Sequence, residues 1–394
     1  MASNTAGTLT GDCARHADGE VARTRMLALV GSVLVCVSGS ACATVFCVGT
    51  GNELSTAMET AAYNDQNDEI HIRTGTLKRS GAVGTVPRWE YNTGAGSGDV
   101  TRTLTLSGGW TDCNTQVDDP RLTVLDAEYQ GSAVQFMVDN TAGTINVRNL
   151  TITRGYHNGS VLAGSAGGGD LGVFAPFSTS TVVLERLIVV AGQSNASDGT
   201  LAGGILIIGG GGLTVTLRNN VIAYNTGASN AGLYINTAEA AISVNNNSIF
   251  SNTMSSTTAH GVGLHLINAT GSSYVANNVI VDNRNGSNVA QDLDNALGNT
   301  YLRNNHIGAL TLSVAPVVNL NPTTGDPGWT LVGIYPIPNL ASPLRDSGTN
   351  APNAGIGALD LAGNARIVNT VVDRGAIEAA LNSNPDLIFK DGFQ

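Results

Sequence analysis

The chain has few charged and few aromatic residues. Of its 394 residues, 12% are Asp, Glu, Lys or Arg and 5% are Phe, Trp or Tyr, whereas 42% are hydrophobic and 49 are glycine. Disordered chains are poor in hydrophobic residues and rich in charge, so this composition predicts a folded protein.

Basic clusters are also missing. The 19 Lys and Arg are outnumbered by 30 Asp and Glu, which gives a net charge of −11, and no Lys/Arg cluster follows the first 25 residues. Phosphate backbones are bound by a basic stripe, so nucleic acid is not an expected partner. The glycine run 209–212 is not followed by Lys and Ser or Thr, so no nucleotide site is predicted.

Helical periodicity is confined to one short segment. Within residues 52–62, Leu54, Met58 and Ala61 fall on one helical face, and Asn52 is the expected N-cap. No stretch beyond residue 62 keeps apolar residues at helical spacing for three turns, which excludes a helical bundle.

What the chain does contain is a repeat. Similar short phrases begin at intervals of 37, 33, 27, 31 and 27 residues. They are Val147-Arg-Asn-Leu-Thr-Ile152, Leu184-Glu-Arg-Leu-Ile-Val189, Leu217-Arg-Asn-Asn-Val-Ile222, Val244-Asn-Asn-Asn-Ser-Ile249, Val275-Ala-Asn-Asn-Val-Ile280 and Leu302-Arg-Asn-Asn-His-Ile307. A β-rich repeat of this length is typical of a solenoid, whose coils stack like residues on like.

Asparagine recurs at three offsets of the repeat. The first column is Asn219, Asn246, Asn277 and Asn304, the second is Asn220, Asn247, Asn278 and Asn305, and the third is Asn225, Asn252 and Asn283. Asn tolerates left-handed backbone angles and its amide both donates and accepts, so the first two columns are expected to form a hydrogen-bonded structural ladder. The third column is expected to mark the exit of the following strand. An antiparallel sandwich is the alternative architecture, because it too has many short strands.

The N-terminal region has the features of an export signal. Arg23 and Arg25 precede an apolar run from Met26, and Ala41 and Ala43 form a small-residue cleavage site. We expect residues 1–25 to be an upstream extension, residues 26–43 to be a signal peptide, and no membrane span to remain after cleavage. A retained anchor and a lipoprotein acylated at Cys42 are the alternatives.

Cleavage after Ala43 would leave two cysteines, Cys47 and Cys113. An even number in an exported chain favours a disulfide between them, and two unpaired thiols are the alternative.

Several segments resemble the secreted right-handed parallel β-helix repeat proteins of the pectin-lyase-like superfamily. The segments are Phe46-Cys-Val-Gly, Leu106-Ser-Gly-Gly-Trp110, Ser342–Gly348, Asp360–Ile367 and Val372–Glu378. The resemblance implies an all-β, single-stranded right-handed parallel β-helix with an N-terminal capping helix. We expect a cap and first coils over 44–100, the β-helix over 101–310, irregular coils that cap the back end over 311–380, and a C-terminal tail over 381–394.

The motifs of polysaccharide-degrading members are incomplete. Asp118-Asp119 precedes the regular coils, His260-Gly261 lacks a preceding Gly, and no Arg-x-Lys occurs. The best set of carboxylates for Ca²⁺ is Asp282, Asp292 and Asp294, with Arg284 or Arg303 nearby, although solvated loop residues are the alternative interpretation. Strand alternation directs His265 outward, where we expect an ordinary surface residue.

These observations predict an exported, extracytoplasmic β-helix protein without a required cofactor. Its expected role is non-catalytic, with a long face presented to polysaccharide or to a cell-surface component. The alternative is a polysaccharide lyase or glycoside hydrolase of the same superfamily. Trp89, Trp110 and Trp329 lie outside the regular coils, which counts against sugar stacking on those rings.

Overall fold

The structure is a computed structural model of the whole chain. It describes the backbone of residues 8–9 and all of residues 43–78, 89–94, 101–138, 142–158, 167–177, 179–195, 201–257 and 261–380. The predicted upstream extension 1–25, the predicted signal peptide 26–43 and the tail 381–394 lie outside the described residues, apart from Ala43 and the backbone of residues 8–9.

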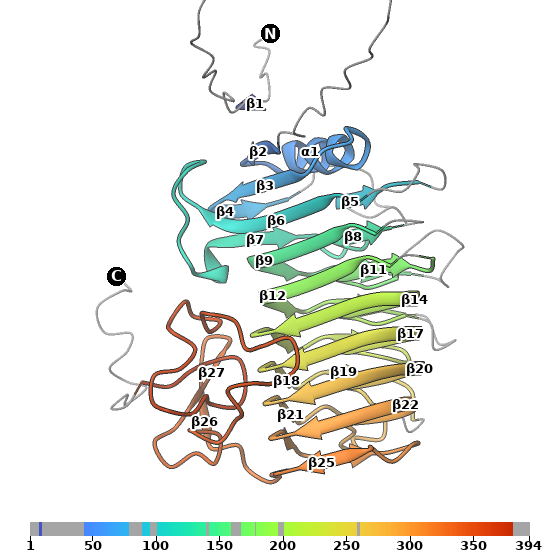
Figure 1. Cartoon of the computed structure of the whole chain (residues 1–394), viewed down its shortest axis with the longest axis vertical. Helices are drawn as coiled ribbons and strands as arrows, with labels where there is room; N and C mark the ends of the chain where they lie inside the picture. Colours follow the sequence, from blue (N-terminus) through green and yellow to red (C-terminus); the bar gives the residue numbers. More distant parts are fainter. Residues whose placement is uncertain are drawn as a thin grey trace, which may run out of the picture.

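The chain winds into a stack of β-strand coils, with one helix at the N-terminal end of the stack, called its front below and drawn at the top of Figure 1. The main sheet contains β1 (Thr8–Leu9), β2 (Thr44–Val48), β3 (Asp68–Arg73), β4 (Gly75–Leu77), β5 (Trp89–Asn92), β6 (Thr103–Trp110), β7 (Thr123–Asp126), β8 (Val134–Met137), β9 (Thr144–Thr153), β11 (Leu171–Ala175), β12 (Thr181–Val190), β14 (Ile205–Arg218), β15 (Val221–Ala223), β17 (Leu233–Asn245), β18 (Ser248–Phe250), β20 (Leu264–Ala276), β21 (Val279–Val281), β22 (Leu293–Arg303), β23 (His306–Ile307), β24 (Leu310–Thr311) and β25 (Val318–Leu320).

Four short strands form a second parallel sheet along the stack, and two more form a hairpin. The second sheet contains β10 (Tyr156–His157), β13 (Gln193–Ser194), β16 (Thr226–Gly227) and β19 (Thr253–Met254), and the hairpin contains β26 (Trp329–Val332) and β27 (Tyr335–Pro338). The helices are α1 (Gly51–Tyr63) and the 3₁₀ turn η1 (Pro120–Leu122).

The strand register confirms the predicted coil repeat. The first residues of the six phrases pair with one another in succession: Val147 with Leu184, Leu184 with Leu217, Leu217 with Val244, Val244 with Val275, and Val275 with Leu302. In the main sheet, the pairing of β1 with β2 is antiparallel, whereas the strands that link successive described coils are parallel. The architecture is a parallel β-helix, and the antiparallel sandwich is excluded.

The core fills the inside of the coils. Val147, Leu184, Leu217, Val244 and Val275 are fully buried. A second column of pairs runs Leu125, Ile152, Val189, Ile222, Ile249 and Ile280 on the next face of the coil. Burying each such side chain contributes about 1.5–3 kcal/mol, so the stacked columns are the main source of stability.

The predicted front helix is present and covers the first coil. Leu54 and Met58 are buried, and the Trp89 indole donates a 2.8 Å hydrogen bond to the Gly51 carbonyl. The expected N-cap was wrong, because Thr50 caps the helix and forms a reciprocal capping box with Glu53. Cys47 of β2 and Cys113, in the loop after β6, form a disulfide.

Residues 329–380, called the C-terminal segment below, lie against the side of the stack (Figure 1). The sequence interpretation placed this region over the back end. The strands β15, β18 and β21 carry apolar side chains that point out of the coil, among them Val221, Phe250 and Val279. Leu344, Leu361 and Ile377 pack on this outer face, which explains why the segment lies at the side.

Buried charges help to shape the C-terminal segment. Arg366 is 1% exposed, and its Nη2 donates to the carbonyls of Asp373 and Gly375 at 2.7 Å. The buried Glu378 carboxylate accepts from the backbone of Val368 and Asp373. These contacts hold the segment in a defined conformation although β26 and β27 are its only described strands. Among the described residues, no helix has the length and hydrophobicity needed to span a membrane.

Candidate anion-binding site

The turn between two faces of the coil positions the polar side chains of the candidate site. At this turn six residues have positive φ, between 51° and 59°. They are Asn149, Arg186, Asn219, Asn246, Asn277 and Asn304. Asn adopts this left-handed conformation at low cost, so the first Asn column marks the turn. Arg186 stands where most coils have asparagine.

The two asparagine columns next to this turn have different partners. In the second column, the Nδ2 atoms of Asn220, Asn247 and Asn278 each donate to the Oδ1 of the next residue in the column, at 2.9, 3.0 and 3.0 Å. These residues are fully buried. Their hydrogen bonds run along the stack and tie each coil to the next.

The first column binds the C-terminal segment. Asn219 Nδ2 donates to the Ile356 carbonyl at 2.7 Å, and Asn246 Nδ2 donates to the Asp373 carbonyl at 3.1 Å. Asn304 Nδ2 donates to the Ser347 carbonyl at 2.9 Å. One contact within the column also occurs, from Asn277 Nδ2 to Asn246 Oδ1 at 3.2 Å. Sequence reasoning expected a ladder here, and it had no means of identifying the distant partner.

The third column continues into an aspartate. Asn225 Nδ2 donates to Asn252 Oδ1, Asn252 Nδ2 donates to Asn283 Oδ1, and Asn283 Nδ2 donates to Asp292 Oδ1. Asp292 is fully buried, and its other oxygen accepts from the Ala309 amide at 2.7 Å. Burial raises the pKa of Asp292 to about 6. Asp292 therefore terminates a structural row of hydrogen bonds.

A cavity of about 300 Å³ lies beside the first column, between the coils and the C-terminal segment. We call it the arginine cleft. Its lining residues are Gln116, Asp118, Arg148, Asn149, Glu185, Arg186, Arg218, Ala358 and Leu359. They come from the loop after β6, from β9, β12 and β14, and from the C-terminal segment.

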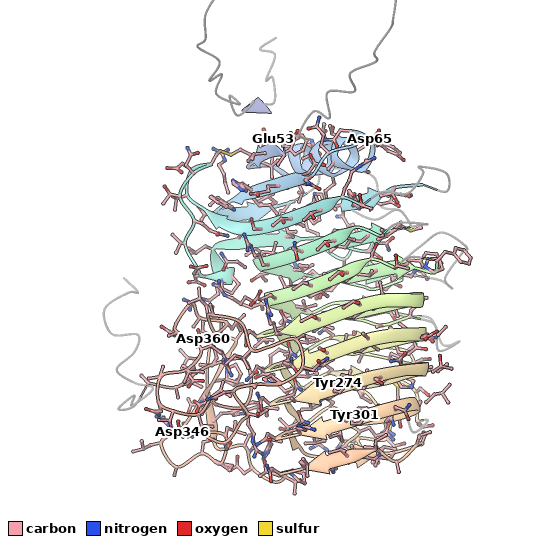
Figure 2. All side chains as sticks on the ribbon, viewed as in Figure 1. Glu53, Asp65, Tyr274, Tyr301, Asp346 and Asp360 are labelled. Atoms are coloured by element: carbon pink, nitrogen blue, oxygen red, sulfur yellow. A yellow bond between two sulfur atoms is a disulfide. The ribbon has the colours of Figure 1, made fainter. Side chains whose placement is uncertain are left out.

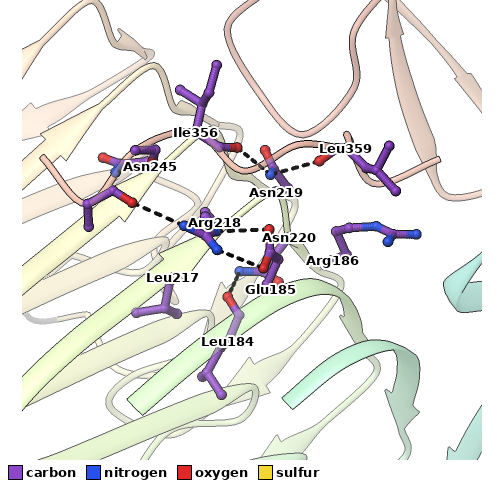
Figure 3. A network of polar contacts seen from close by, with 12 residues as sticks. Leu184, Glu185, Arg186, Leu217, Arg218, Asn219, Asn220, Asn245, Ile356 and Leu359 are labelled. Carbon is purple, nitrogen blue, oxygen red and sulfur yellow. Dashed lines mark hydrogen bonds and ion pairs between the residues drawn. The ribbon is translucent and has the colours of Figure 1, made fainter. Parts of the chain in front are cut away.

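Strand register brings the charged residues of the cleft together. Arg148 of β9 pairs with Glu185 of β12, which pairs with Arg218 at the end of β14. Arg218 forms an ion pair with Glu185, with Nε 2.9 Å from Oε1, and its Nη1 donates to the Ala354 carbonyl at 3.1 Å (Figure 3). A Cβ at Gly357 would lie 2.5 Å from Glu185 Oε1, so the C-terminal segment presses closely on this pair.

Arg186 is the buried cation of the cleft. Its side chain is 8% exposed, Nη1 donates to Asp118 Oδ1 at 2.7 Å, and Nη2 donates to Asn149 Oδ1 at 3.1 Å. Nε of Arg186 is buried and has no hydrogen-bond partner among the described residues. A buried donor without a partner is costly, so this atom favours an acceptor in the cleft.

The charge of the cleft is opposite in sign to that of the protein. Three guanidinium groups and two carboxylates line it, which leaves a net charge of +1 in a chain whose net charge is −11. Arg148 is exposed and has no ion-pair partner in the described parts of the chain. Guanidinium groups recognise carboxylate, sulfate and phosphate oxygens, so the cleft has the chemistry of an anion-binding site.

Comparisons with known proteins place this arrangement in no established family. No protein-family model matches the chain, and no curated protein sequence matches it. Among solved structures, the crystal structure of pectate lyase Pel9A matches with 14% identity and a TM-score of 0.30, over 81% of this chain and 90% of that chain.

The three aspartates considered for Ca²⁺ have separate partners. Asp282 lies 3.5 Å from Arg284 Nη2, Asp292 ends the third column, and Asp294 accepts from the Ser313 amide at 3.2 Å. The described residues contain no group of three His, Cys, Asp or Glu side chains placed to hold a metal ion. We therefore assign no metal site to them. His260, considered for catalysis, lies outside the described residues.

The expectation for His265 was wrong. Its ring is buried, with 5% of the residue exposed, and it stacks on Tyr234 at 4.8 Å. Nδ1 lies 2.8 Å from Asn230 Oδ1. The side chain does point out of its strand, but the Asn230 turn covers it.

Two tyrosines lie on the outer face of the stack. Tyr274 of β20 and Tyr301 of β22 are paired in register, and their rings stack at 5.0 Å with an angle of 13° (Figure 2). Both are only partly buried. The same column of paired residues continues along the stack: Ser243 pairs with Tyr274, and Thr216 pairs with Ser243. Thr216 lies two residues before Arg218 in β14. The tyrosine pair and the arginine cleft thus share one face of the solenoid.

Sequence reasoning missed the arginine cleft, although a signal was present. The phrases at 147, 184 and 217 contain Arg148, Arg186 and Arg218, whereas the next two phrases contain no charged residue. Arg186 stands in a column whose neighbouring members, Asn149 and Asn219, are asparagine, and such a change of residue type indicates a local function. Asp118, which was considered only as a hydrolase carboxylate, is the ion-pair partner of Arg186.

Proposed function

We propose that this protein is an exported, non-catalytic β-helix that binds an acidic polysaccharide at the arginine cleft and so attaches to a surface that carries it. The observation on which the proposal depends is the net positive cleft, with exposed Arg148 and the unpartnered Nε of Arg186. Sugar carboxylates or sulfates would accept from these donors.

The tyrosine pair is on the same face as the cleft, but the C-terminal segment covers the surface between them: Ser243 and Asn245 are 3% and 0% exposed, and Asn353 donates to Ser243 Oγ at 2.9 Å. Three rungs of the stack separate Arg218 from Arg303, the residue two positions after Tyr301. At about 4.8 Å per rung this is about 14 Å, the length of a few sugar residues. Aromatic rings favour stacking on the apolar faces of sugars, but the covered surface separates the tyrosine pair from the cleft, so the pair and Arg303 are not part of the proposed site.

Binding is tested with polygalacturonate and alginate against a neutral polysaccharide, by calorimetry at low and high salt. We expect binding to the acidic polymers only, and weaker binding at high salt, because the contact is ionic. Arg148→Ala removes one exposed charge and should weaken binding about tenfold without changing the thermal midpoint.

Arg303→Ala is the matched control. Arg303 is exposed on the same face, so this variant makes the same charge change outside the cleft. An equal loss in both variants would indicate attraction by the general field of the protein, and no loss in either would remove the cleft from the binding site.

The alternative function is a polysaccharide lyase or hydrolase. Hydrolysis uses an acid and a base or nucleophile on one face, but both carboxylates that line the cleft, Asp118 and Glu185, are in ion pairs with arginine. We expect no release of unsaturated or reducing ends from pectate or alginate, with or without added Ca²⁺. Detection of either product would establish the enzyme and exclude the non-catalytic function.

A further inference from the structure

The back end of the solenoid exposes part of its core. Leu310 of β24 pairs with Leu293, which is fully buried, so Leu310 occupies an inward position of the last coil. It is nevertheless 37% exposed, and Leu312 and Val317 are 37% and 55% exposed. Equivalent positions in earlier coils are covered by the next coil, and the last coil has no successor among the described residues.

Neither the C-terminal segment nor charge protects this end. The segment lies at the side of the stack, and among the described residues no element lies beyond β25 in Figure 1. Residues 304–325 contain no Asp, Glu, Lys or Arg, in a protein of net charge −11. Exposed sheet ends are ordinarily protected by charged side chains or by a cover. In the described part of the chain no cover lies over this end, and the nearest charges, Arg303 and Arg374, stand at its side.

We propose that the last coil binds the last coil of a second copy of this chain. The apolar side chains that would meet are Leu310, Leu312, Val314 and Val317, and at the rim of this end Leu297 and Leu320, whose strand partners Ile267 and Arg303 are on the outer face; each is between 36% and 55% exposed. Their exposed area is roughly 400 Å² per copy, close to the nonpolar share of a standard interface of about 800 Å² per partner.

The opposite end of the solenoid limits the assembly to two chains. Helix α1 covers the first coil, so the described part of each chain has one open end. Two identical ends meet through a two-fold axis, and such an isologous contact closes after one pairing and does not grow into a fibre. Pro316 and Pro322 flank β25 and lack backbone donors, so side-chain packing contributes more than strand pairing.

The test is sedimentation equilibrium of the chain with residues 381–394 in place. We expect a dimer at tens of micromolar and a monomer on dilution. Val317→Lys should raise the dissociation constant at least tenfold, because it places a charge against its own copy at the two-fold contact. Leu340→Lys is the matched control, since Leu340 is 72% exposed and lies in the C-terminal segment.

A crosslinking experiment locates the contact with substitutions at exposed positions, which should not destabilise the fold. Asn319 is exposed in β25, and Asn319→Cys should form an intermolecular disulfide under mild oxidation. Glu59→Cys, on the exposed face of α1, should not. A chain that stays monomeric at about 100 µM overturns the proposal, as does a dimer that crosslinks through position 59. Dimer formation only after deletion of 381–394 would show that the tail covers this end, and would also overturn it.

Discussion

At the residue scale, neighbouring asparagines in one turn stabilise different parts of the molecule. Asn247 donates to Asn278 inside the stack, whereas Asn246 has a φ of 54° and donates outward to the Asp373 carbonyl. The backbone alternates the direction of successive side chains, so one position faces the coil interior and the other faces the C-terminal segment. Identical residue types therefore contribute to coil stacking and to segment docking.

This difference predicts the effects of two substitutions at residue 246. Asn246→Gly keeps the left-handed backbone and loses the side-chain hydrogen bond, at a cost of about 1 kcal/mol. Asn246→Val loses the same bond and forces a β-branched residue into the left-handed region, which costs about 1–2 kcal/mol more. Urea unfolding of both variants measures the difference, and equal losses would mean that φ at this position relaxes freely.

At the element scale, the front of the solenoid depends on a crosslink and a capped helix. The disulfide joins Cys47 of β2 to Cys113, 66 residues later, and so attaches the first coil to the loop after β6. His71 lies between these parts, with Nδ1 3.0 Å from the Cys113 carbonyl and its ring stacked on Trp110 at 3.6 Å. The first coil has a neighbour on one side only, so such additional connections matter most here.

Removing the disulfide should lower the free energy of unfolding. A closed loop of this length restricts the unfolded chain by about 4 kcal/mol. Cys113→Ser should therefore destabilise by about that amount, and Cys47→Ser by a similar amount. The double variant should be no less stable than either single variant, because one bond is lost in each case. Denaturant unfolding measures all three, and additive losses would contradict the crosslink.

At the scale of the whole molecule, buried acids make stability depend on pH. Burial raises the pKa of Asp68 and Asp292 to about 6 and that of Glu378 to about 7. Burial also raises the pKa values of Asp170, Asp360 and Asp373. In the unfolded chain these groups titrate near pH 4, so the folded state binds more protons between pH 4 and 7. Their contribution to stability is complete below pH 4 and is lost as the pH rises through 7.

Two histidines act in the opposite direction. Burial lowers the pKa of His157 and His306, which costs stability as the pH falls below about 6.5. The acids are more numerous, so we expect a higher thermal midpoint at pH 5 than at pH 8, measured by calorimetry. Glu378→Gln should flatten the dependence, whereas a midpoint that rises toward pH 8 would contradict the burial of these carboxyl groups.

The repeat could be predicted from the sequence because each coil needs the same residue types at the same positions. Val244 and Val275 had to be apolar to fill the coil, and Asn246 and Asn277 had to permit a left-handed turn, so the register followed from the spacing. The helix at 51–63 was readable for a similar reason, since its pattern is local. Its cap at Thr50 was misassigned by two residues because Asn52 and Thr50 are both good caps.

The arginine cleft, the docking of the C-terminal segment and the burial of His265 could not be predicted in this way. Asp118 meets Arg186 across 68 residues, and Asn219 meets Leu359 across 140. Nothing in the local sequence of either partner specifies such a distant contact. His265 was misplaced for the same reason, because alternation gives the direction of a side chain from its strand and not what lies over it.

The sequence by itself determined the solenoid, its register and its front helix, because these depend on short-range periodicity and on the conformational preferences of single residues. Only the tertiary structure decided that the C-terminal segment lies along the side and that three arginines converge beside it. That placement depends on contacts between residues far apart in the chain. These contacts form only after the coils have brought Val221, Phe250 and Val279 together into one apolar outer face.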